Sequence, residues 1–276
     1  MSIASLSTSL RLTEDEIWVC NTAGDIKYPA DGNAYCYELE DSSYWFGHRN
    51  DLIISDIKRF PPKGPILDVG GGNGFVTKRM ITEGFEASLL EPGMVGATNA
   101  KKARQIPEVI CSRFEDANFP PSSLSAVGLF DVLEHIGNDS KFLSALHTAL
   151  KPNGMLYVTV PAHQYLWSES DNYAQHFRRY NWQMTKTLIE NKFTFRYFTY
   201  FFTILAPAIF FLRTLPYRIM TYKQKNLLSG KSEHGLDGGM VVNLISTLLK
   251  KELGLIQHGK HLYFGTSYLW VLQKKI

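Results

Sequence analysis

A glycine-rich segment that follows an apolar run holds the residues with the clearest chemical use. Asp68 lies in the apolar run 65–69, and the run breaks into Gly70, Gly71, Gly72, Asn73 and Gly74 before a helix-compatible segment. Glycines in such a loop let a ligand lie against backbone N–H groups with no side chain in the way. Dinucleotide sites and adenosyl-sulfonium sites both use this arrangement, so the loop alone leaves two interpretations open.

Two further residues separate these interpretations. Glu91 ends the next predicted strand, roughly 20 residues after the loop, where a carboxylate can accept both hydroxyls of an adenosine ribose. The dinucleotide fingerprint G-x-G-x-x-G, counted from Gly70, places its last glycine where this chain has Phe75. The pattern therefore disfavours a pyrophosphate site and favours an adenosyl-sulfonium ligand.

The elements that must position these residues alternate between strand-like and helix-like segments. The predicted strands are 66–69, 87–90, 109–111, 126–130, 155–160, 194–200 and 266–272. The predicted helices between them are 75–82, 94–104, 139–150 and 182–191. This alternation predicts an α/β fold, a Rossmann-like, doubly wound and mostly parallel sheet with helices on both faces. Ligands of such sheets bind at the carboxyl ends of the strands, where the loop, Glu91 and the block 131–135 all stand.

The chain before residue 63 predicts a separate N-terminal cap, residues 1–62, that contributes to the substrate pocket. The stretch 14–40 has Gly, Pro, Asp and Asn punctuation and predicts short strands or turns. A helix is expected over 44–59, capped by the preceding serines and stopped by two prolines. Residues 63–276 are then the catalytic core, in which 202–260 forms an insertion, a lid or an interface segment.

The insertion contains two segments whose roles the sequence leaves open. The polar, glycine-bearing stretch 223–239 is either a mobile lid or a solvated loop, and an amphipathic helix is expected over 240–251. The segment 197–215 is nearly all apolar, with Arg213 as its one charge. It is interpreted as a buried element, a homodimer interface or, over 198–215, a membrane-surface contact. Pro207 in its middle argues against a membrane span.

Composition restricts the class of protein. The 276 residues are 45% hydrophobic and 20% charged, which supplies a sizeable core, and the net charge of +3 is too weak to indicate nucleic-acid binding. The three cysteines show no metal-ligand spacing and form no even-numbered framework, so we expect no metal and a reducing cytoplasm. Residues 1–16 lack the apolar stretch of a secretory signal.

Four blocks of the chain resemble those of class I S-adenosylmethionine-dependent methyltransferases. They are ILDVGGGNGF at 66–75, LLEPG at 89–93, GLFDVLEHI at 128–136 and LKPNGMLYVTVPA at 150–162. The blocks keep the order and spacing of that family from about residue 64 to 193. The tail 166–193 is similar to a bacterial subgroup that acts on small molecules or is associated with the cell envelope.

This resemblance implies S-adenosyl-L-methionine as cofactor and S-adenosyl-L-homocysteine as product, and it assigns roles to the matching residues. The glycine loop with Asn73 would hold the methionine part, Asp68 would order the loop and its amino group, and Arg49 would pair with the cofactor carboxylate. Glu91 and Pro92 would bind the ribose. The remaining cofactor-binding residues implied are Phe114, Glu115 and Asp116 at the adenine, where the chain departs from the usual family pattern, and Asp131 and Val132 along the cofactor.

For the acceptor side, two histidines are candidate general bases. His135 follows the fourth predicted core strand, and the alternative is that it fixes its loop by a backbone hydrogen bond. His176 stands among charged residues after the fifth, and the alternative there is a salt-bridged structural loop. The expected acceptor-binding residues are Tyr44, Trp45, Arg178, Arg179 and Tyr180.

The expected function is transfer of a methyl group to an oxygen or nitrogen of a small-molecule or lipid- or sugar-linked acceptor. A base- or glutamine-methylating Asn/Asp-Pro-Pro-Tyr block is absent after the strand 126–130, so no nucleic-acid partner is expected. The expected location is the cytoplasm, including the inner membrane face. Two alternatives stay open: a non-catalytic binding or scaffold protein, and an enzyme that uses the same cofactor site for other chemistry.

Overall fold

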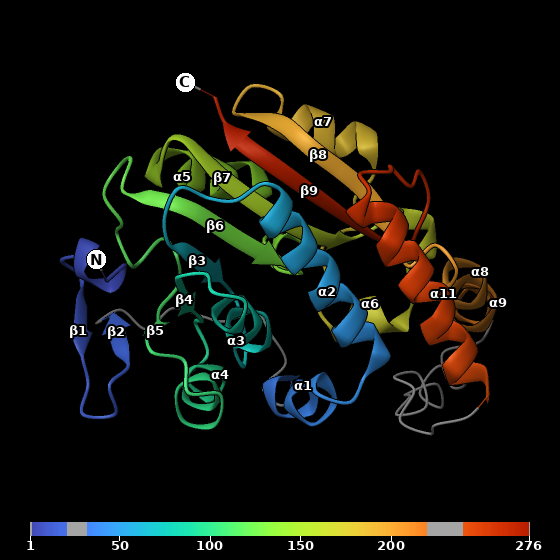
Figure 1. The fold of residues 1–276 in the computed structure, drawn as a ribbon, viewed down its shortest axis with the longest axis horizontal. Helices are drawn as coiled ribbons and strands as arrows, with labels where there is room; N and C mark the ends of the chain where they lie inside the picture. Colours follow the sequence, from blue (N-terminus) through green and yellow to red (C-terminus); the bar gives the residue numbers. More distant parts are fainter. Residues whose placement is uncertain (1, 21–31, 220–239, 276) are drawn as a thin grey trace.

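The computed structural model describes residues 2–20, 32–219 and 240–275, and a nine-stranded sheet runs through them (Figure 1). The strand order is β1-β2-β5-β4-β3-β6-β7-β9-β8. The strands are β1 (Leu10–Leu12), β2 (Trp18–Cys20), β3 (Ile66–Val69), β4 (Ala87–Leu90), β5 (Val109–Cys111), β6 (Leu124–Phe130), β7 (Leu150–Pro161), β8 (Phe193–Phe201) and β9 (Ser267–Lys274). The predicted Rossmann-like fold class is confirmed.

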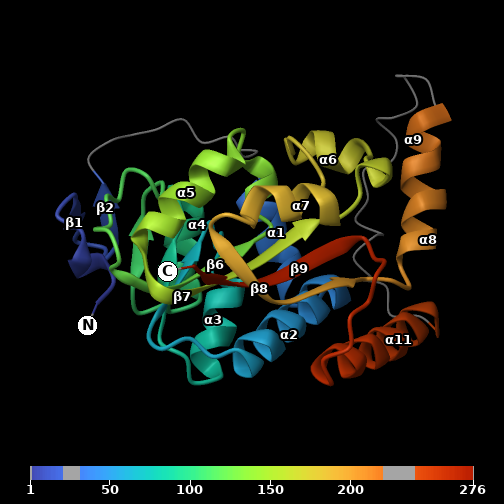
Figure 2. The same cartoon turned by 90° about the horizontal axis from the view of Figure 1, so that it is seen from above.

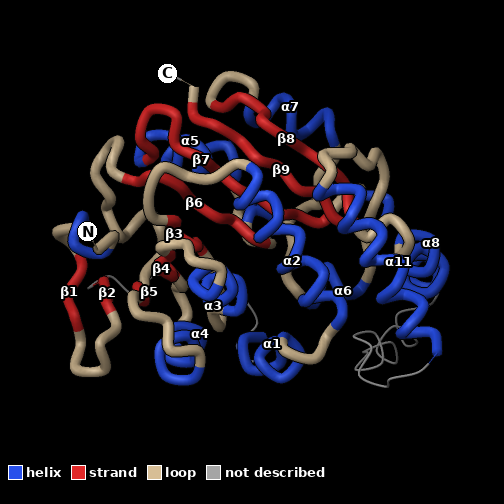
Figure 3. The backbone as a smooth tube through the Cα atoms, in the orientation of Figure 1, coloured by secondary structure: helices blue, strands red, loops and turns tan. Residues whose placement is uncertain are grey.

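The centre of the sheet is parallel and buried. β3 lies between β4 and β6 with both neighbours parallel to it, and β6 is parallel to β7. β9 lies between β7 and β8 and is antiparallel to both, and β8 forms this edge of the sheet (Figure 3). At the other side, β2 pairs with β5 and carries β1 as an antiparallel partner. The carboxyl ends of β3, β4 and β6 therefore meet at one edge, which is where the predicted site residues stand.

Helices cover both faces of the sheet (Figure 2). α2 (Tyr44–Arg59), α3 (Phe75–Thr82) and α11 (Met240–Gln257) pack on one face, while α5 (Asp139–Ala149) and α7 (Trp182–Ile189) pack on the other. Side chains cap several of these helices: Ser43 accepts a hydrogen bond from the backbone of α2, and Asn138 and Asn181 do the same for α5 and α7. α4 (Met94–Thr98) continues into a π-helical turn at 99–103.

The main departure from the sequence prediction is α1 (Gly32–Glu40). The stretch 14–40 was expected to hold strands or turns, and that expectation is wrong for these nine residues. Contacts distant in sequence explain the helix: Glu40 at its end pairs with Arg104 at 2.8 Å, and Asn73 donates to the backbone of Asn33. Tertiary contacts of this kind override local turn signals.

The apolar segment after β8 changes direction and becomes helical. It forms α8 (Ala206–Ile209), a π-helical turn at Phe210–Thr214 and α9 (Leu215–Ile219), with Pro207 in the first turn of α8. Figure 2 shows α8 and α9 as a column at one edge of the molecule. The described part of the chain contains no helix long and apolar enough to cross a membrane. The glycine-bearing stretch 223–239, interpreted as a lid or solvated loop, lies outside the described residues, and the division at residue 62 stays a prediction.

Candidate active site

The glycine loop joins β3 to α3 and has the backbone conformation that its composition predicts. Gly70, Gly72 and Gly74 have φ values of 71°, 55° and 80°, which side-chain-bearing residues rarely adopt. A Cβ on Gly70 would lie 2.8 Å from Val132, so that residue packs directly against the loop. A Cβ on Gly72 would meet nothing closer than Asn33, at 3.7 Å. The loop therefore exposes backbone at Gly72, as a close-lying ligand requires.

Asp68 lies beneath the loop. It is fully buried and accepts a hydrogen bond of 2.6 Å from Thr77 Oγ1 at the start of α3. Burial raises the pKa of Asp68 to about 6, although this hydrogen bond acts in the opposite direction. Its position fits the predicted ordering of the loop, and its burial leaves no surface that could contact the amino group of a ligand.

Glu91 follows β4 and turns toward the same loop. Its two carboxylate oxygens accept hydrogen bonds from the backbone of Gly72 at 3.0 Å and of Gly93 at 2.8 Å. Burial raises its pKa to about 7, while these bonds and one from the Asn33 side chain lower it. A carboxylate offers about four acceptor positions, so Glu91 retains capacity for a hydroxyl group. Pro92 follows in the turn that leads to α4.

Asn33 and Glu40 of α1 belong to this part of the site and were not predicted. The Asn73 side chain donates to the Asn33 backbone at 2.8 Å and to Glu40 at 3.3 Å, so it fastens α1 over the glycine loop. Asn73 is buried and holds the fold together here. A sequence signal for Asn33 was lacking, because its partners are distant in the chain and its own segment resembles a turn.

The three residues expected at the adenine differ in how far they are buried. Phe114 is buried in the core against Phe119 and Phe142, which leaves its ring little surface for stacking on a base. Glu115 is exposed. Asp116 accepts a hydrogen bond of 2.6 Å from Arg113. The structure therefore gives Phe114 a packing role.

Arg49 and Asp131 form an ion pair between α2 and the end of β6. Thr159 of β7 donates to the other oxygen of Asp131 at 3.2 Å. The Arg49 guanidinium also lies 5.2 Å from the ring centre of Trp45. Arg49 thus reaches the edge where the cofactor was expected, and its partner in this structure is Asp131.

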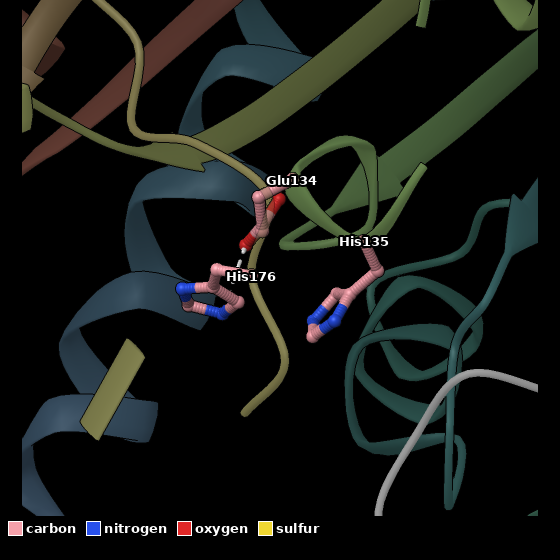
Figure 4. Close-up of side chains that lie close together, drawn as sticks. All are labelled: Glu134, His135 and His176. Atoms are coloured by element: carbon pink, nitrogen blue, oxygen red, sulfur yellow. Dashed lines mark ion pairs between the residues drawn. The ribbon is translucent and has the colours of Figure 1, made fainter. Parts of the chain in front are cut away.

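Glu134, His135 and His176 gather beside this ion pair (Figure 4). The first two lie on the turn after β6, and His176 comes from the loop after α6 (Glu169–Tyr173). The two imidazole ring centres are 4.8 Å apart, and His176 Nε2 lies 4.0 Å from a carboxylate oxygen of Glu134. One potential ligand atom from each of the three residues lies within 4.8 Å of those of the other two. Imidazole nitrogens and a carboxylate oxygen are atoms that metal ions use as ligands. The sequence had suggested no metal site, because the contributing segments are far apart in the chain.

The surroundings shift the pKa values of Glu134 and His135 in opposite directions. Burial, together with the nearby Asp131, raises the pKa of Glu134 well above its ordinary value. Burial, followed by the neighbouring His176, lowers the pKa of His135 to about 4, so its ring is neutral at pH 7 and a weak base. His176 Nδ1 instead lies 2.9 Å from a carboxylate oxygen of Asp171. Burial alone would raise the pKa of Asp171, but His176 and Arg179 more than offset this and lower it.

The acceptor pocket was expected to be lined by Arg178, Arg179 and Tyr180. In the structure, their polar groups donate hydrogen bonds to carboxylates of the protein. Arg179 donates to both oxygens of Asp171, at 2.8 and 3.0 Å. Arg178 and Tyr180 both donate to Asp139, at 2.6 and 3.0 Å. Tyr180 is fully buried, and its contact with an acceptor stays a prediction. Arg178, Arg179 and Tyr180 thus pair with carboxylates inside the protein, as in the salt-bridged loop that the sequence left open as an alternative.

Tyr44 and Trp45 begin α2 on the other side of the site. The Trp45 ring stacks on Phe202 at 5.3 Å, just after β8. His48, one turn along, lies 2.9 Å from Glu252 of α11, and Glu252 also accepts from the backbone of Phe202 and Thr203 at 2.8 Å. These contacts join the start of α2 to the C-terminal segment. The part of the site in which the sequence predicts the acceptor is thus assembled from segments distant in the chain.

Solved structures of known proteins share the fold of this chain. One similar structure is phosphoethanolamine N-methyltransferase 2 of Haemonchus contortus, solved in complex with phosphomonomethylethanolamine and S-adenosylhomocysteine. It superposes with a TM-score of 0.54 at 19% identity, over 90% of this chain and 58% of that one. A methyltransferase solved with the Haloferax volcanii Trm112 activator gives 0.57 at 12% identity, over 88% of this chain and 94% of that one. The fold is that of a class I S-adenosylmethionine-dependent methyltransferase, as the sequence predicted.

Sequence comparison gives the family. A methyltransferase domain model matches residues 45–198, more than half of the chain, and the chain belongs to this methyltransferase domain family. A ubiquinone biosynthesis O-methyltransferase of Photobacterium profundum is 29% identical over 97 residues, which cover 33% of this chain and 41% of that protein. The match thus spans less than half of the relative's length.

Proposed function

We propose that this protein binds S-adenosyl-L-methionine and transfers its methyl group to an oxygen or nitrogen of a small-molecule or lipid- or sugar-linked acceptor. The observation that carries the proposal is Glu91, whose carboxylate is held against the backbone of Gly72 in a loop that is open to a ligand at that glycine. A buried carboxylate beside bare backbone fits a ribose with two hydroxyl groups. When bound, this cofactor supplies a methyl group already activated by its sulfonium.

The protein's own residues divide the remaining work. Gly72 presents backbone to the ligand, Glu91 accepts hydrogen bonds, and α1 covers the loop through Asn33. Arg49 and Asp131 link α2 to the end of β6 and so fix the width of the site. Fixed geometry of this kind is what in-line displacement needs, since the nucleophile must be aligned and water excluded.

Proton removal from the acceptor is assigned to His176. Its Nδ1 faces Asp171 at 2.9 Å, which leaves Nε2 directed toward Glu134 and His135 at the edge of the site. A carboxylate behind an imidazole fixes the ring and stabilises the positive charge that forms as it takes a proton. His135, whose pKa is lowered to about 4, is suited to positioning by its neutral ring.

A methyl-labelling assay tests this function. The protein is incubated with methyl-tritiated S-adenosylmethionine and a cell extract, and the products are separated into water-soluble small molecules, organic-soluble lipids, protein and nucleic acid. We expect protein-dependent label in one of the first two fractions. Cofactor binding without label in any fraction would support the non-catalytic alternative, and label confined to nucleic acid would contradict the proposed acceptor class.

A further inference from the structure

The Asn33 side chain of α1 lies against Glu91, in the part of the site where the ribose is expected. Its amide nitrogen donates a hydrogen bond to the Glu91 carboxylate. Cβ atoms added to Gly93 and Gly96 would lie 3.2 and 2.8 Å from that nitrogen, so glycine at both positions makes room for the amide. α4, which contains Gly96, packs beside α1 (Figure 1). The amide therefore fills a space that its neighbours leave open beside the carboxylate.

The hydrogen-bond capacity of Glu91 is nearly filled in this structure. A carboxylate offers about four acceptor positions. The backbone N–H groups of Gly72 and Gly93 take two of them, and the Asn33 amide takes a third. A ribose that donates both of its hydroxyls needs two positions, whereas only about one remains. One present donor must therefore leave, and the Asn33 side chain is the donor that does not belong to the backbone around the carboxylate.

The Asn33 amide can leave Glu91 while α1 stays docked. Asn73 donates to the backbone oxygen of Asn33 at 2.8 Å, and Glu40 at the other end of the helix pairs with Arg104 at 2.8 Å. Neither contact uses the Asn33 side chain. Rotation about its two side-chain torsions can thus carry the amide away from the carboxylate with the helix held in place.

We propose that the Asn33 amide is a placeholder for one ribose hydroxyl, and that S-adenosylmethionine must displace it from Glu91 in order to bind. In the ligand-free protein the placeholder keeps a buried carboxylate hydrogen-bonded, which lowers the apparent affinity for any ligand that needs its position. S-adenosylmethionine and S-adenosylhomocysteine share the ribose, so the contact weakens both and favours product release. The placeholder adds a regulation of the cofactor site to the proposed function, and it rests on that function for the ribose at Glu91.

Titration calorimetry of Asn33→Ala with S-adenosylhomocysteine tests the placeholder. Removal of the competing amide should tighten binding about tenfold, because a hydrogen bond to a charged group no longer has to be broken. The backbone contact of residue 33 with Asn73 remains in this variant, so α1 keeps its anchor. The matched control is Glu38→Gln, at an exposed position on the same helix, which should bind like wild type.

Ligand analogues identify the group with which the amide competes. The 2′-deoxy and 3′-deoxy analogues of S-adenosylhomocysteine each donate one hydroxyl fewer and so need one acceptor position fewer on Glu91. For at least one of the two analogues, the affinities of Asn33→Ala and wild type should therefore agree within about twofold.

Three outcomes overturn the placeholder: equal or weaker binding of S-adenosylhomocysteine by Asn33→Ala, the same gain for all three ligands, or the same gain in Glu38→Gln. If wild type binds S-adenosylhomocysteine and one of these outcomes is found, the placeholder alone falls and the proposed function stands. Binding by Asn33→Ala where wild type shows none would support the placeholder. If neither protein binds the ligand, both the placeholder and the proposed function fall.

Discussion

At the residue scale, burial and pairing set the protonation of the site. Glu91 and Asp68 are both buried, and burial raises their pKa values to about 7 and about 6. Burial, followed by the neighbouring His176, lowers the pKa of His135 to about 4, although Asp131 acts in the opposite direction. His176 Nδ1 lies 2.9 Å from a carboxylate oxygen of Asp171, which stands directly behind the ring. Two histidines that lie side by side thus have different roles in the proposed chemistry.

Replacing His176 should impair turnover and spare cofactor binding. We expect His176→Ala to lower the rate of label transfer by about 10²- to 10⁴-fold, the usual contribution of a general base. The affinity for S-adenosylmethionine should stay within twofold of wild type by titration calorimetry. The control is His258→Ala, at an exposed position directly after α11. Full turnover in His176→Ala would rule out the base assignment.

The pKa of Glu91 predicts how cofactor affinity depends on pH. Below about pH 7 the carboxyl is protonated in the ligand-free protein and loses an acceptor position, and above it the ionised form can accept a hydrogen bond from a ribose hydroxyl group. Affinity should therefore rise as pH increases from 6 to 8. Glu91→Gln, which cannot ionise, should show a flatter profile. Identical profiles for the two proteins would refute the ribose role.

Residue identity was easier to predict than residue partnership. Glu91 and the glycines could be predicted because their spacing from the strand ends is fixed by the fold. Arg178, Arg179 and Tyr180 have the residue types of an anion pocket, yet Asp139 and Asp171 satisfy them. Tertiary packing decides which polar groups pair with one another, and these pairs cannot be predicted from a single sequence.

At the element scale, the strands and helices of the core were predictable because each rests on local chemistry. β3, α3, β4 and β5 have the predicted bounds, and the sequence marks the ends of β3 and β4 by Gly70 and Glu91. α1 was missed, because the contacts of Asn33 and Glu40 stabilise a segment whose composition favours turns. The apolar run after β8 was interpreted as a buried element, a homodimer interface or a membrane-surface contact. It forms α8 and α9, which carry exposed apolar side chains such as Phe211 and Ile219.

Glu252 links three elements, and its loss should loosen them together. It accepts from His48 of α2 and from the backbone of Phe202 and Thr203, so Glu252→Ala leaves buried donors without a partner. We expect the free energy of unfolding to fall by at least about 2 kcal/mol in urea denaturation. Lys251→Ala, exposed on the same helix, should change it by less than about 0.5 kcal/mol. Equal effects of the two variants would show that the link is unimportant.

At the scale of the whole molecule, one buried acid should make stability depend on pH. Neither carboxylate oxygen of Asp56 on α2 has a hydrogen-bond partner among the described residues, and burial raises its pKa from 3.8 to about 7 despite Arg59. A raised pKa in the folded state means that its contribution to stability is full below pH 3.8 and is lost as pH rises through about 7.

Asp56→Asn should therefore stabilise the protein at pH 8 by roughly 2–4 kcal/mol and much less at pH 5, as measured by urea denaturation at both values. Asp51→Asn is the matched control, because Asp51 lies on the same helix with its side chain 43% exposed. It should show no such pH dependence. A gain of equal size for Asp56→Asn at both pH values would contradict the buried charge.

The central claim is that the glycine loop and Glu91 hold S-adenosylmethionine, and isothermal titration of the wild-type protein tests it most directly. We predict saturable binding of both S-adenosylmethionine and S-adenosylhomocysteine. Glu91→Ala should weaken it by roughly 1–3 kcal/mol through lost charged hydrogen bonds, while Glu86→Ala, at an exposed position before β4, should not. Absence of binding for both ligands, or equal affinity in Glu91→Ala and wild type, would contradict the claim.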